Sequence, residues 1–193
     1  MTICIFGDSI VWGASDCEKG GWADCLKNHL MDDDIDVYNL GISGDTTEDL
    51  LKRFDTEAEA RNPDIIIFAI GINDSLSLDK DGLIKFQKNI STLVNKARKF
   101  TNKIIFIGLT NVDESRTTPY LSEETGEAYN NQSIGEYDEI IKSFCEENNL
   151  TFVDVLGLLI NDDDLCDGLH PGSIGHQKLF EAIKEKIEPI WKE

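Results

Sequence analysis

Five short runs of apolar residues are spaced along the chain, and each is continuous rather than alternating with polar residues. They are Ile3 to Phe6, Val37 to Leu40, Asp64 to Gly71, Lys103 to Leu109 and Thr151 to Val155. A continuous apolar run rich in β-branched residues is typical of a strand that is covered on both faces, as in a parallel sheet. The pattern therefore predicts five buried strands.

Segments with helical periodicity lie between these runs. Over Leu83 to Phe100, apolar residues such as Ile90 and Val94 recur at three- and four-residue steps and form a stripe on one helix face. Similar stripes run from Tyr129 to Glu147 and Ser173 to Trp191, and weaker ones from Gly21 to Met31 and Thr46 to Ala60. Because parallel neighbours need right-handed crossover helices, this alternation predicts a doubly wound α/β sandwich.

Polar and glycine residues stand where the predicted strands end, which is where ligands bind in such folds. The segments are Gly7-Asp8-Ser9, Gly41-Ile42-Ser43-Gly44-Asp45, Gly71-Ile72-Asn73-Asp74 and, before the last helix, Asp167-Gly168-Leu169-His170-Pro171. We expect these four segments, which are distant in sequence, to meet at one edge of the sheet.

The convergent residues include what a hydroxyl nucleophile requires. A serine hydroxyl is a poor nucleophile until a base takes its proton, and the base needs a carboxylate to orient it. We expect Ser9 to attack, His170 to accept its proton and Asp167 to hold the imidazole. A tight turn, stiffened by Pro171, lets a carboxylate three residues before a histidine fold back onto the ring.

Donors for a developing oxyanion can also be named. The backbone N–H groups of Ser9 and Gly44 and the side-chain amide of Asn73 form the predicted oxyanion hole. Of the other two histidines, His29 is expected on the surface. His176 lies on the last helix and is expected to pack or hydrogen-bond near the site.

Taken together, the four segments resemble the signature blocks of the SGNH, or GDSL-type, hydrolase family, in the family's order and over nearly the whole chain. The resemblance implies a flavodoxin-like three-layer α/β/α sandwich with a five-stranded parallel sheet. It implies a serine esterase, thioesterase or lipase-like activity without metal or organic cofactor. Its site residues are then Ser9, Gly44, Asn73 and His170, with Asp167 completing the triad. Asn131 corresponds only loosely to a family position.

Each residue also has a plainer interpretation. Ser9 alone could cap a helix after a strand, and Ser43 is a competing nucleophile, although its surroundings lack the final glycine of a GxSxG elbow. Asp8 and Asp74 could ligate metals in a binuclear phosphoesterase, but Asp8 is expected to fix the loop that carries Ser9. Cys166 is expected to be a small packing residue.

Other functions remain open at this stage. A carbohydrate- or protein-binding module could keep the fold without the chemistry, but it has no need for all five groups. Transfer of the acyl group to an acceptor alcohol would use the same acyl-enzyme as hydrolysis. The sequence favours hydrolysis of small acyl esters, with thioesters, acetylated sugars and lysophospholipids as further candidates. The small size and the absence of an obvious lid favour short acyl groups.

Length and charge limit the partners. At 193 residues the chain is expected to form one domain, residues 1–193. Its formal net charge of -19 would repel nucleic acid and anionic membranes at long range. A small-molecule ester is therefore the expected partner, and the sequence does not indicate an oligomeric state.

Cysteine usage and hydropathy bear on the compartment. The five cysteines are an odd number without metal-ligand spacing, which is typical of reduced thiols. No leader precedes the first strand, and no apolar run approaches the roughly 20 residues of a membrane helix. A cytoplasmic location without stable membrane insertion is the expectation.

The sequence also predicts the surroundings of two further segments and of two tryptophans. Asn111 to Asn131 is expected to be a long polar loop beside the site, and Asn161 to Asp164 a solvated acidic turn rather than a metal loop. Trp12 and Trp22 could shape the substrate pocket or lie in the core.

Overall fold

The computed structural model describes residues 1–76, 80–117 and 128–192. The strands are β1 (Thr2–Gly7), β2 (Asp36–Gly41), β3 (Ile65–Ala69), β4 (Ile104–Ile107) and β5 (Thr151–Val153). The helices are α1 (Ser9–Trp12), α2 (Trp22–His29), α3 (Thr47–Arg61), α4 (Lys80–Ala97), α5 (Glu114–Thr117), α6 (Asn131–Asn148) and α7 (Ser173–Lys192), with short 3₁₀ turns η1 (Met31–Asp33) and η2 (Asp74–Leu76). Each predicted strand and long helix is present, whereas the shortest helices were not predicted.

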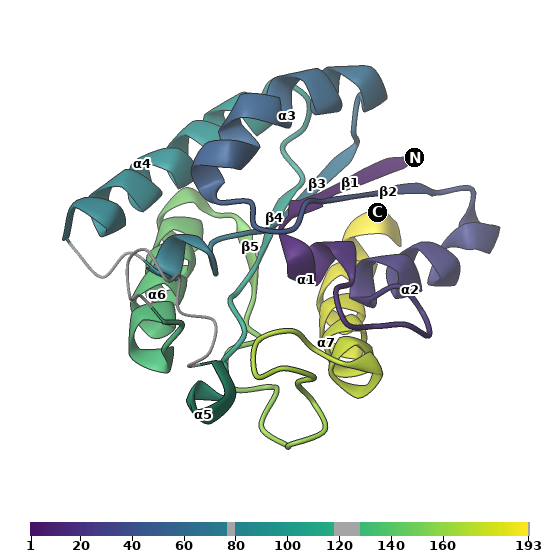
Figure 1. The fold of residues 1–193 in the computed structure, drawn as a ribbon. Coiled ribbons are helices and arrows are strands. Elements are labelled where there is room, and N and C mark those ends of the chain that lie inside the picture. Colours follow the sequence, from purple (N-terminus) through teal and green to yellow (C-terminus); the bar gives the residue numbers. More distant parts are fainter. Residues whose placement is uncertain (77–79, 118–127, 193) are drawn as a thin grey trace.

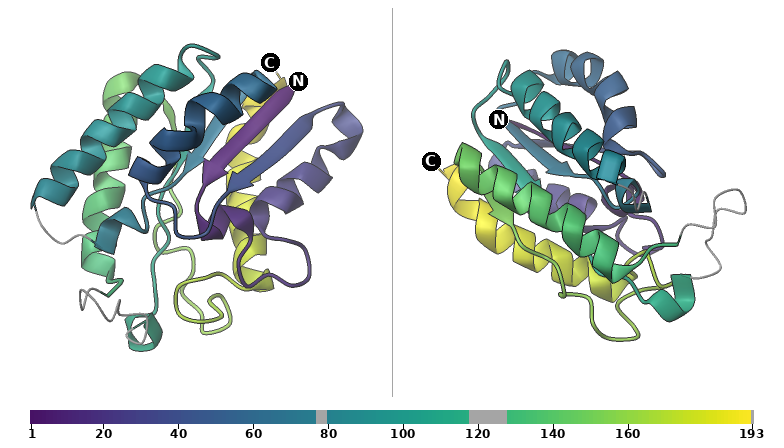
Figure 2. Two further views of the ribbon diagram at one scale, coloured as in Figure 1. Left: turned by 45° about the horizontal axis from the view of Figure 1, so that its top comes forward. Right: turned by 90° about the vertical axis from the view of Figure 1, so that its left-hand side faces the viewer.

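The five strands form one parallel sheet in the order β2-β1-β3-β4-β5. Helices α2 and α7 cover one face, and α3, α4 and α6 cover the other (Figures 1 and 2). This is the doubly wound, flavodoxin-like order, so the predicted three-layer sandwich is confirmed.

The core on the α3 face is organised by a row of phenylalanines in register across the sheet. Phe6 pairs with Phe68, Phe68 with Phe106, and Phe106 with Phe152. From α3, Phe54 packs on this row with ring centroids 4.9 Å from Phe6 and 5.7 Å from Phe68. Large buried rings contribute strongly to packing energy, so this row helps to fix both the strand register and the seat of α3.

Strands β1, β2 and β3 end at the same position in the sheet register. Gly7, the last residue of β1, pairs with Gly41 at the end of β2 and with Ala69 at the end of β3. A Cβ at Gly7 would lie 2.2 Å from Val11 Cγ2 and 2.3 Å from the Ala69 carbonyl oxygen. Only glycine therefore lets α1 turn back onto the end of the sheet directly after β1.

Differences from the prediction are confined to segment ends and connections. Helix α4 begins at Lys80, three residues before the predicted start at Leu83. The loop expected from Asn111 to Asn131 contains the short helix α5, and its residues 118–127 lie outside the described residues. In the part of the chain that the structure describes, no helix is long and apolar enough to cross a membrane.

Candidate active site

Ser9 is the first residue of α1 and stands immediately beyond the end of β1. The carboxylate of Asp8 caps this helix by accepting a hydrogen bond of 2.9 Å from the Ile10 N–H. Asp8 thus fixes the turn that carries Ser9, as expected. Burial, aided by the negative charges of Asp74 and Asp45, raises the pKa of Asp8 to about 7.

The Ser9 hydroxyl lies beside the His170 imidazole, with 3.0 Å between Ser9 Oγ and His170 Nε2. The second ring nitrogen, Nδ1, is 2.7 Å from Asp167 Oδ2. Because an ionised carboxylate can only accept, Nδ1 carries the proton and Nε2 is left to accept from the serine hydroxyl. The serine is 7% exposed, so the residue is largely sheltered from solvent.

The turn of Asp167 onto His170 is held by backbone hydrogen bonds. Asp167 Oδ1 accepts from the N–H groups of Leu169 at 3.0 Å and of His170 at 2.7 Å. Burial alone would raise the pKa of Asp167, but these bonds and the one from the His170 ring lower it below its ordinary value. The carboxylate therefore stays ionised where it can orient the imidazole.

Two contacts hold the loop after α1 against the start of α7 and so bring residues 9 and 170 together. Asp16 is buried and accepts a hydrogen bond of 2.8 Å from the Ser173 hydroxyl. His176 is fully buried between Trp22 N–H and the Ala14 carbonyl, each 3.3 Å away. Burial lowers the pKa of His176, so this ring is a neutral structural bridge near the site, which agrees with its predicted role.

Arg116 of α5 binds the chain just before Asp167. Its guanidinium donates to the Leu165 carbonyl at 2.9 Å and to the Cys166 carbonyl, and the Asp113 N–H donates to the Gly168 carbonyl at 2.8 Å. A segment some 50 residues earlier in sequence thus supports the loop that carries Asp167 and His170.

Gly44 lies in a tight turn after β2, closed by a hydrogen bond of 3.2 Å from the Asp45 N–H to the Ile42 carbonyl. Its φ of 83° is in the left-handed region that favours glycine. Apart from atoms of Gly44 and its two chain neighbours, no heavy atom lies within 4 Å of a Cβ built at this position. The turn therefore leaves open space beside its backbone, where a substrate oxygen could approach.

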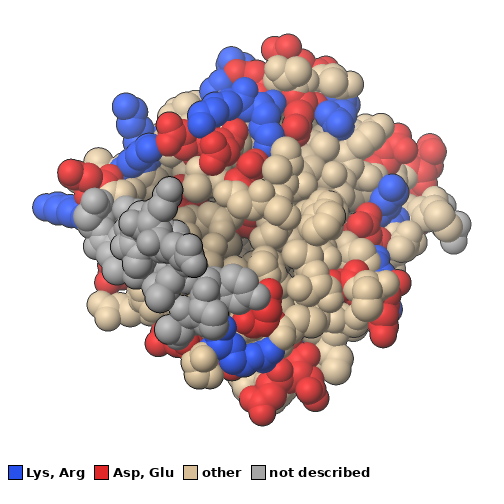
Figure 3. Space-filling model, in the orientation of Figure 1, with Lys and Arg blue, Asp and Glu red and all other residues tan. Residues whose placement is uncertain are grey.

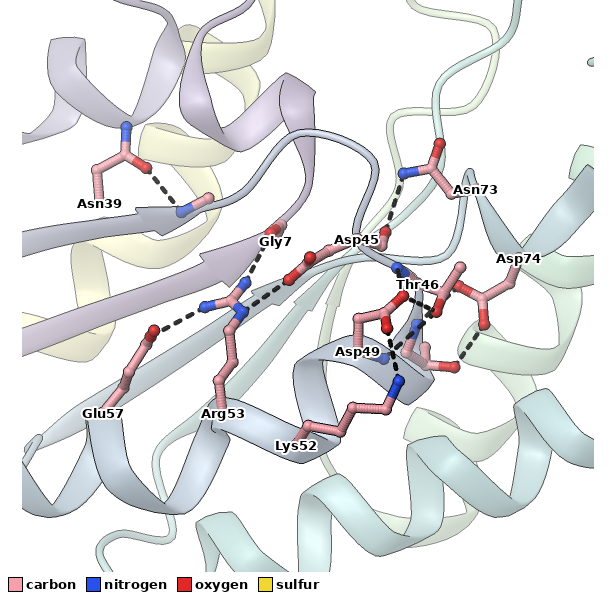
Figure 4. A network of polar contacts seen from close by, with 12 residues as sticks. Gly7, Asn39, Asp45, Thr46, Asp49, Lys52, Arg53, Glu57, Asn73 and Asp74 are labelled. Atoms are coloured by element: carbon pink, nitrogen blue, oxygen red, sulfur yellow. Dashed lines mark hydrogen bonds and ion pairs between the residues drawn. The ribbon is translucent and has the colours of Figure 1, made fainter. Parts of the chain in front are cut away.

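An ionic network fastens this turn to the end of β1 (Figure 4). From α3, Arg53 Nε pairs with Asp45 Oδ2 at 2.6 Å, Nη1 with Glu57 at 2.9 Å, and Nη2 donates to the Gly7 carbonyl at 3.1 Å. Arg53 and Asp45 are 15% and 12% exposed, so the pair is mostly shielded from solvent. One side chain therefore ties the Gly44 turn to the strand that carries Ser9.

The side-chain amide of Asn73 joins the same turn. Its Nδ2 donates to the Asp45 carbonyl at 2.9 Å, and its Oδ1 accepts from the Tyr129 hydroxyl at 2.7 Å. The next residue, Asp74, accepts from the N–H and the hydroxyl of Thr47 at 2.9 and 2.5 Å. The structure thus joins the Asn73 segment to the Gly44 turn, while His170, held by Asp167, hydrogen-bonds to Ser9.

A family comparison agrees with this arrangement. The model of the GDSL-like lipase/acylhydrolase family matches residues 5–178. The chain belongs to this family. As a GDSL-like, or SGNH, hydrolase it acts on ester bonds.

Relatives of this GDSL-like hydrolase include esterases. It is 28% identical over 172 residues to an acetylxylan esterase of Geobacillus stearothermophilus, covering 81% of this chain and 74% of the relative. It is 27% identical over 136 residues to a multidomain esterase of Ruminococcus flavefaciens, of which it spans 16%. A lipase/acylhydrolase from Enterococcus faecalis superposes with a TM-score of 0.79 at 27% identity, covering 97% of this chain and 95% of that one.

Sequence reasoning missed three residues that support the site of this GDSL-like hydrolase, namely Arg53, Arg116 and Tyr129. Each acts on a partner far away in sequence, and a lone arginine or tyrosine carries no local signal. A partial signal did exist for the Gly44 turn. Thr46 and Asp49 form a capping box at the start of α3, a pattern that marks where a helix begins.

Some expectations for individual residues need correction. Cys166 was expected to be a small packing residue, but it is exposed, between buried Leu165 and half-buried Asp167, with its Sγ 3.7 Å from the Ser15 carbonyl oxygen. Trp22 lies in the core, whereas Trp12, at the end of α1, is 59% exposed.

Other residues are where they were expected. His29 is exposed, and Asn161 to Asp163 are exposed too, although Asp164 is buried against Lys178. Ser43, whose exposure was not predicted, is exposed as well. Asn131 clamps the backbone of Val112, accepting from its N–H and donating to its carbonyl, both at 2.9 Å. Asn131 therefore has a structural role beside the site.

Proposed function

We propose that the protein is a serine esterase that hydrolyses small acyl esters through an acyl-enzyme on Ser9. The observation that carries this proposal is the unbroken line of hydrogen bonds from Ser9 Oγ through the His170 ring to Asp167 Oδ2, at 3.0 and 2.7 Å. That line joins residues 161 positions apart, and it provides nucleophile, base and orienting carboxylate in the required order.

The chemistry follows from this order. Ser9 Oγ bonds to the ester carbonyl carbon while its proton passes to His170 Nε2. Collapse of the tetrahedral intermediate breaks the bond to the alcohol oxygen, which leaves with that proton. Water, deprotonated by the same nitrogen, then attacks the acyl-enzyme, and the acid and free Ser9 are released. The N–H groups of Ser9 and Gly44 and the Asn73 amide would stabilise the oxyanion in both halves.

Acetyl esters of sugars are the substrate class that we propose within this activity. The relative from Geobacillus stearothermophilus is an acetylxylan esterase. Structures of that enzyme include catalytic mutants of a serine, an aspartate and a histidine, and the last two are three positions apart, as are Asp167 and His170 here.

The distribution of charge also fits a neutral ester. On the face shown in Figure 3, acidic and basic side chains lie mainly around the edge, and the middle is largely uncharged. Figure 1, in the same orientation, places α1 in the middle of this face. An uncharged substrate can approach such a surface without the repulsion that the net charge of -19 imposes on anions.

A metal-dependent phosphoesterase is less compatible with the roles of the aspartates. Asp8 caps α1, and both oxygens of Asp74 accept hydrogen bonds from Thr47. These two carboxylates are therefore used to build the loops that carry Ser9 and Asn73.

Turnover of a panel of esters by two serine variants tests the proposal. Ser9→Ala should lower kcat for p-nitrophenyl acetate by about 10³-fold or more while leaving the fold intact. Ser43→Ala, which removes the exposed competing serine, should keep turnover close to wild type. Retained activity in Ser9→Ala would sink the assignment. Acetylated xylo-oligosaccharides should be cleaved better than p-nitrophenyl octanoate, and the reverse preference would reject the proposed substrate class.

A further inference from the structure

The amide of Asn73 is held from two sides, and the two partners fix which way it faces. A backbone carbonyl can only accept, so the nitrogen of the amide must be the atom that faces the Asp45 carbonyl, 2.9 Å away (Figure 4). The oxygen then faces Tyr129, whose hydroxyl lies 2.7 Å from it and must donate. Nδ2 has two hydrogens, and Asp45 takes only one of them.

Tyr129 is well placed to act on Asn73 because the two segments are joined at a second point. Tyr129 precedes Asn130, which caps α6 by accepting from the Ser133 N–H at 2.8 Å. The Ser133 hydroxyl donates at 2.6 Å to the carbonyl of Ser75, two residues after Asn73. The start of α6 is thereby fastened to η2, and the phenol is carried to the amide by an anchored segment.

The hydroxyl of Tyr129 keeps its proton under the conditions of an ester assay. Burial, with a further contribution from the negative charge of Asp8, raises the pKa of Tyr129 to about 12. The Tyr129 hydroxyl is therefore protonated and can donate a hydrogen bond to the Asn73 oxygen throughout the assay. A hydrogen bond donated to an amide oxygen also polarises the amide and strengthens its N–H groups as donors.

We propose that Tyr129 is a positioning residue that fixes the Asn73 amide with its nitrogen toward the reacting carbonyl. Without this bond the Asp45 carbonyl alone would hold the amide, and rotation about the Cβ–Cγ bond would be free to turn the second N–H away from the oxyanion. The proposal rests on the proposed esterase function and adds to it a residue that lies outside the four signature segments.

Tyr129→Phe tests the proposal because it removes the hydroxyl and keeps the ring. We expect kcat for p-nitrophenyl acetate to fall about tenfold, the effect of losing one hydrogen bond in the transition state, with KM changed less than about twofold. Tyr38→Phe, at a half-exposed tyrosine of β2, is the matched control and should keep wild-type kcat. Wild-type kcat in Tyr129→Phe would overturn the proposal.

A double-mutant cycle separates positioning from general loosening of the site. Asn73→Ala should lower kcat by about 10² to 10³, the range for one oxyanion donor. In that background, Tyr129→Phe should cost less than about twofold, because the amide on which it acts is gone. An equal loss in both backgrounds would mean a structural role only and would overturn the proposal.

A turnover-independent readout distinguishes failure of this inference from failure of the esterase proposal. Diethyl p-nitrophenyl phosphate would bond its phosphorus to Ser9 Oγ and release p-nitrophenolate, and it places an oxygen in the oxyanion site. We expect Ser9 to be labelled about tenfold more slowly in Tyr129→Phe. Labelling at the wild-type rate would reject the role of Tyr129 alone, whereas a wild-type enzyme that is not labelled on Ser9 would reject both.

Discussion

The two sides of Ser9 are built in different ways. The turn Ile42–Asp45 and Asn73, which would carry the proposed oxyanion hole and are called the oxyanion side below, are held by charged and polar side chains of α3, above all Arg53. The base loop, Leu165–Pro171, is held mostly through its backbone, by Asp167 and by Arg116 of α5. The Arg53–Asp45 pair is mostly shielded from solvent, whereas the Arg116 side chain is 37% exposed.

This difference in exposure predicts that the two arginines contribute differently to the stability of the fold and to activity. Removing one member of a shielded ion network leaves its partners without compensation and costs stability. An exposed side chain bound to backbone carbonyls contributes little to stability, yet it can still decide where an imidazole points. We therefore expect the oxyanion side to be coupled to folding and the base loop mainly to activity.

The largest effect on turnover is expected from Asp167→Asn. The asparagine oxygen can still accept from the backbone N–H groups, but its NH₂ group favours the wrong imidazole tautomer. We expect kcat to fall by about 10⁴-fold, while the thermal unfolding midpoint stays close to wild type. A loss below tenfold, measured with p-nitrophenyl acetate, would show that the imidazole is oriented by some other group.

The comparison itself is tested by Arg53→Ala beside Arg116→Ala. Both should lower kcat about tenfold, since each removes a support of the site. Arg53→Ala should also lower the free energy of unfolding by about 2 kcal/mol, because Asp45 and Glu57 lose a shielded partner. Arg116→Ala should lower it by less than about 1 kcal/mol. Urea unfolding measures both values, and equal losses of stability would contradict the distinction.

The last contrast concerns the dependence of stability, rather than turnover, on pH. Between about pH 4 and pH 7 the folded state keeps the proton of Asp8, whose pKa is raised to about 7, while the unfolded state releases it near 3.8. The free energy of unfolding should therefore decrease as pH rises through this window. Asp8→Asn keeps an oxygen for the Ile10 N–H and should make this decrease shallower, leaving the part that comes from Asp138 and Asp74, whose pKa values burial also raises.

Asp167→Asn is the matched control for that measurement. Because the pKa of Asp167 is lowered, its contribution to stability is present above its ordinary pKa and is lost as pH falls below about 4. The variant should therefore keep the decrease between about pH 4 and pH 7. A wild-type slope in Asp8→Asn, measured by urea unfolding across this range, would reject the assignment to Asp8.

The sequence alone was sufficient for the order and type of the main elements. Buried parallel strands such as β3 read as continuous apolar runs, and crossover helices such as α4 show a stripe at helical spacing, so both patterns are local. The candidate site residues could also be identified from the sequence, because the residues that follow the strands of a doubly wound sheet lie at one edge of that sheet. The exposure of Cys166 could not be predicted, because residues in loops do not follow the periodic apolar pattern that marks buried positions in helices and strands.

The sequence by itself determined the fold, and it predicted that Ser9, Gly44, Asn73, Asp167 and His170 gather beyond one edge of the sheet. Only the tertiary structure decided how they are held. The clamp of Arg116 on the base loop, the tie from Arg53 to Gly7 and the bond from Tyr129 to Asn73 join residues that are 46 to 56 positions apart. Such contacts depend on how helices and loops pack on the sheet, and no spacing in the chain encodes them.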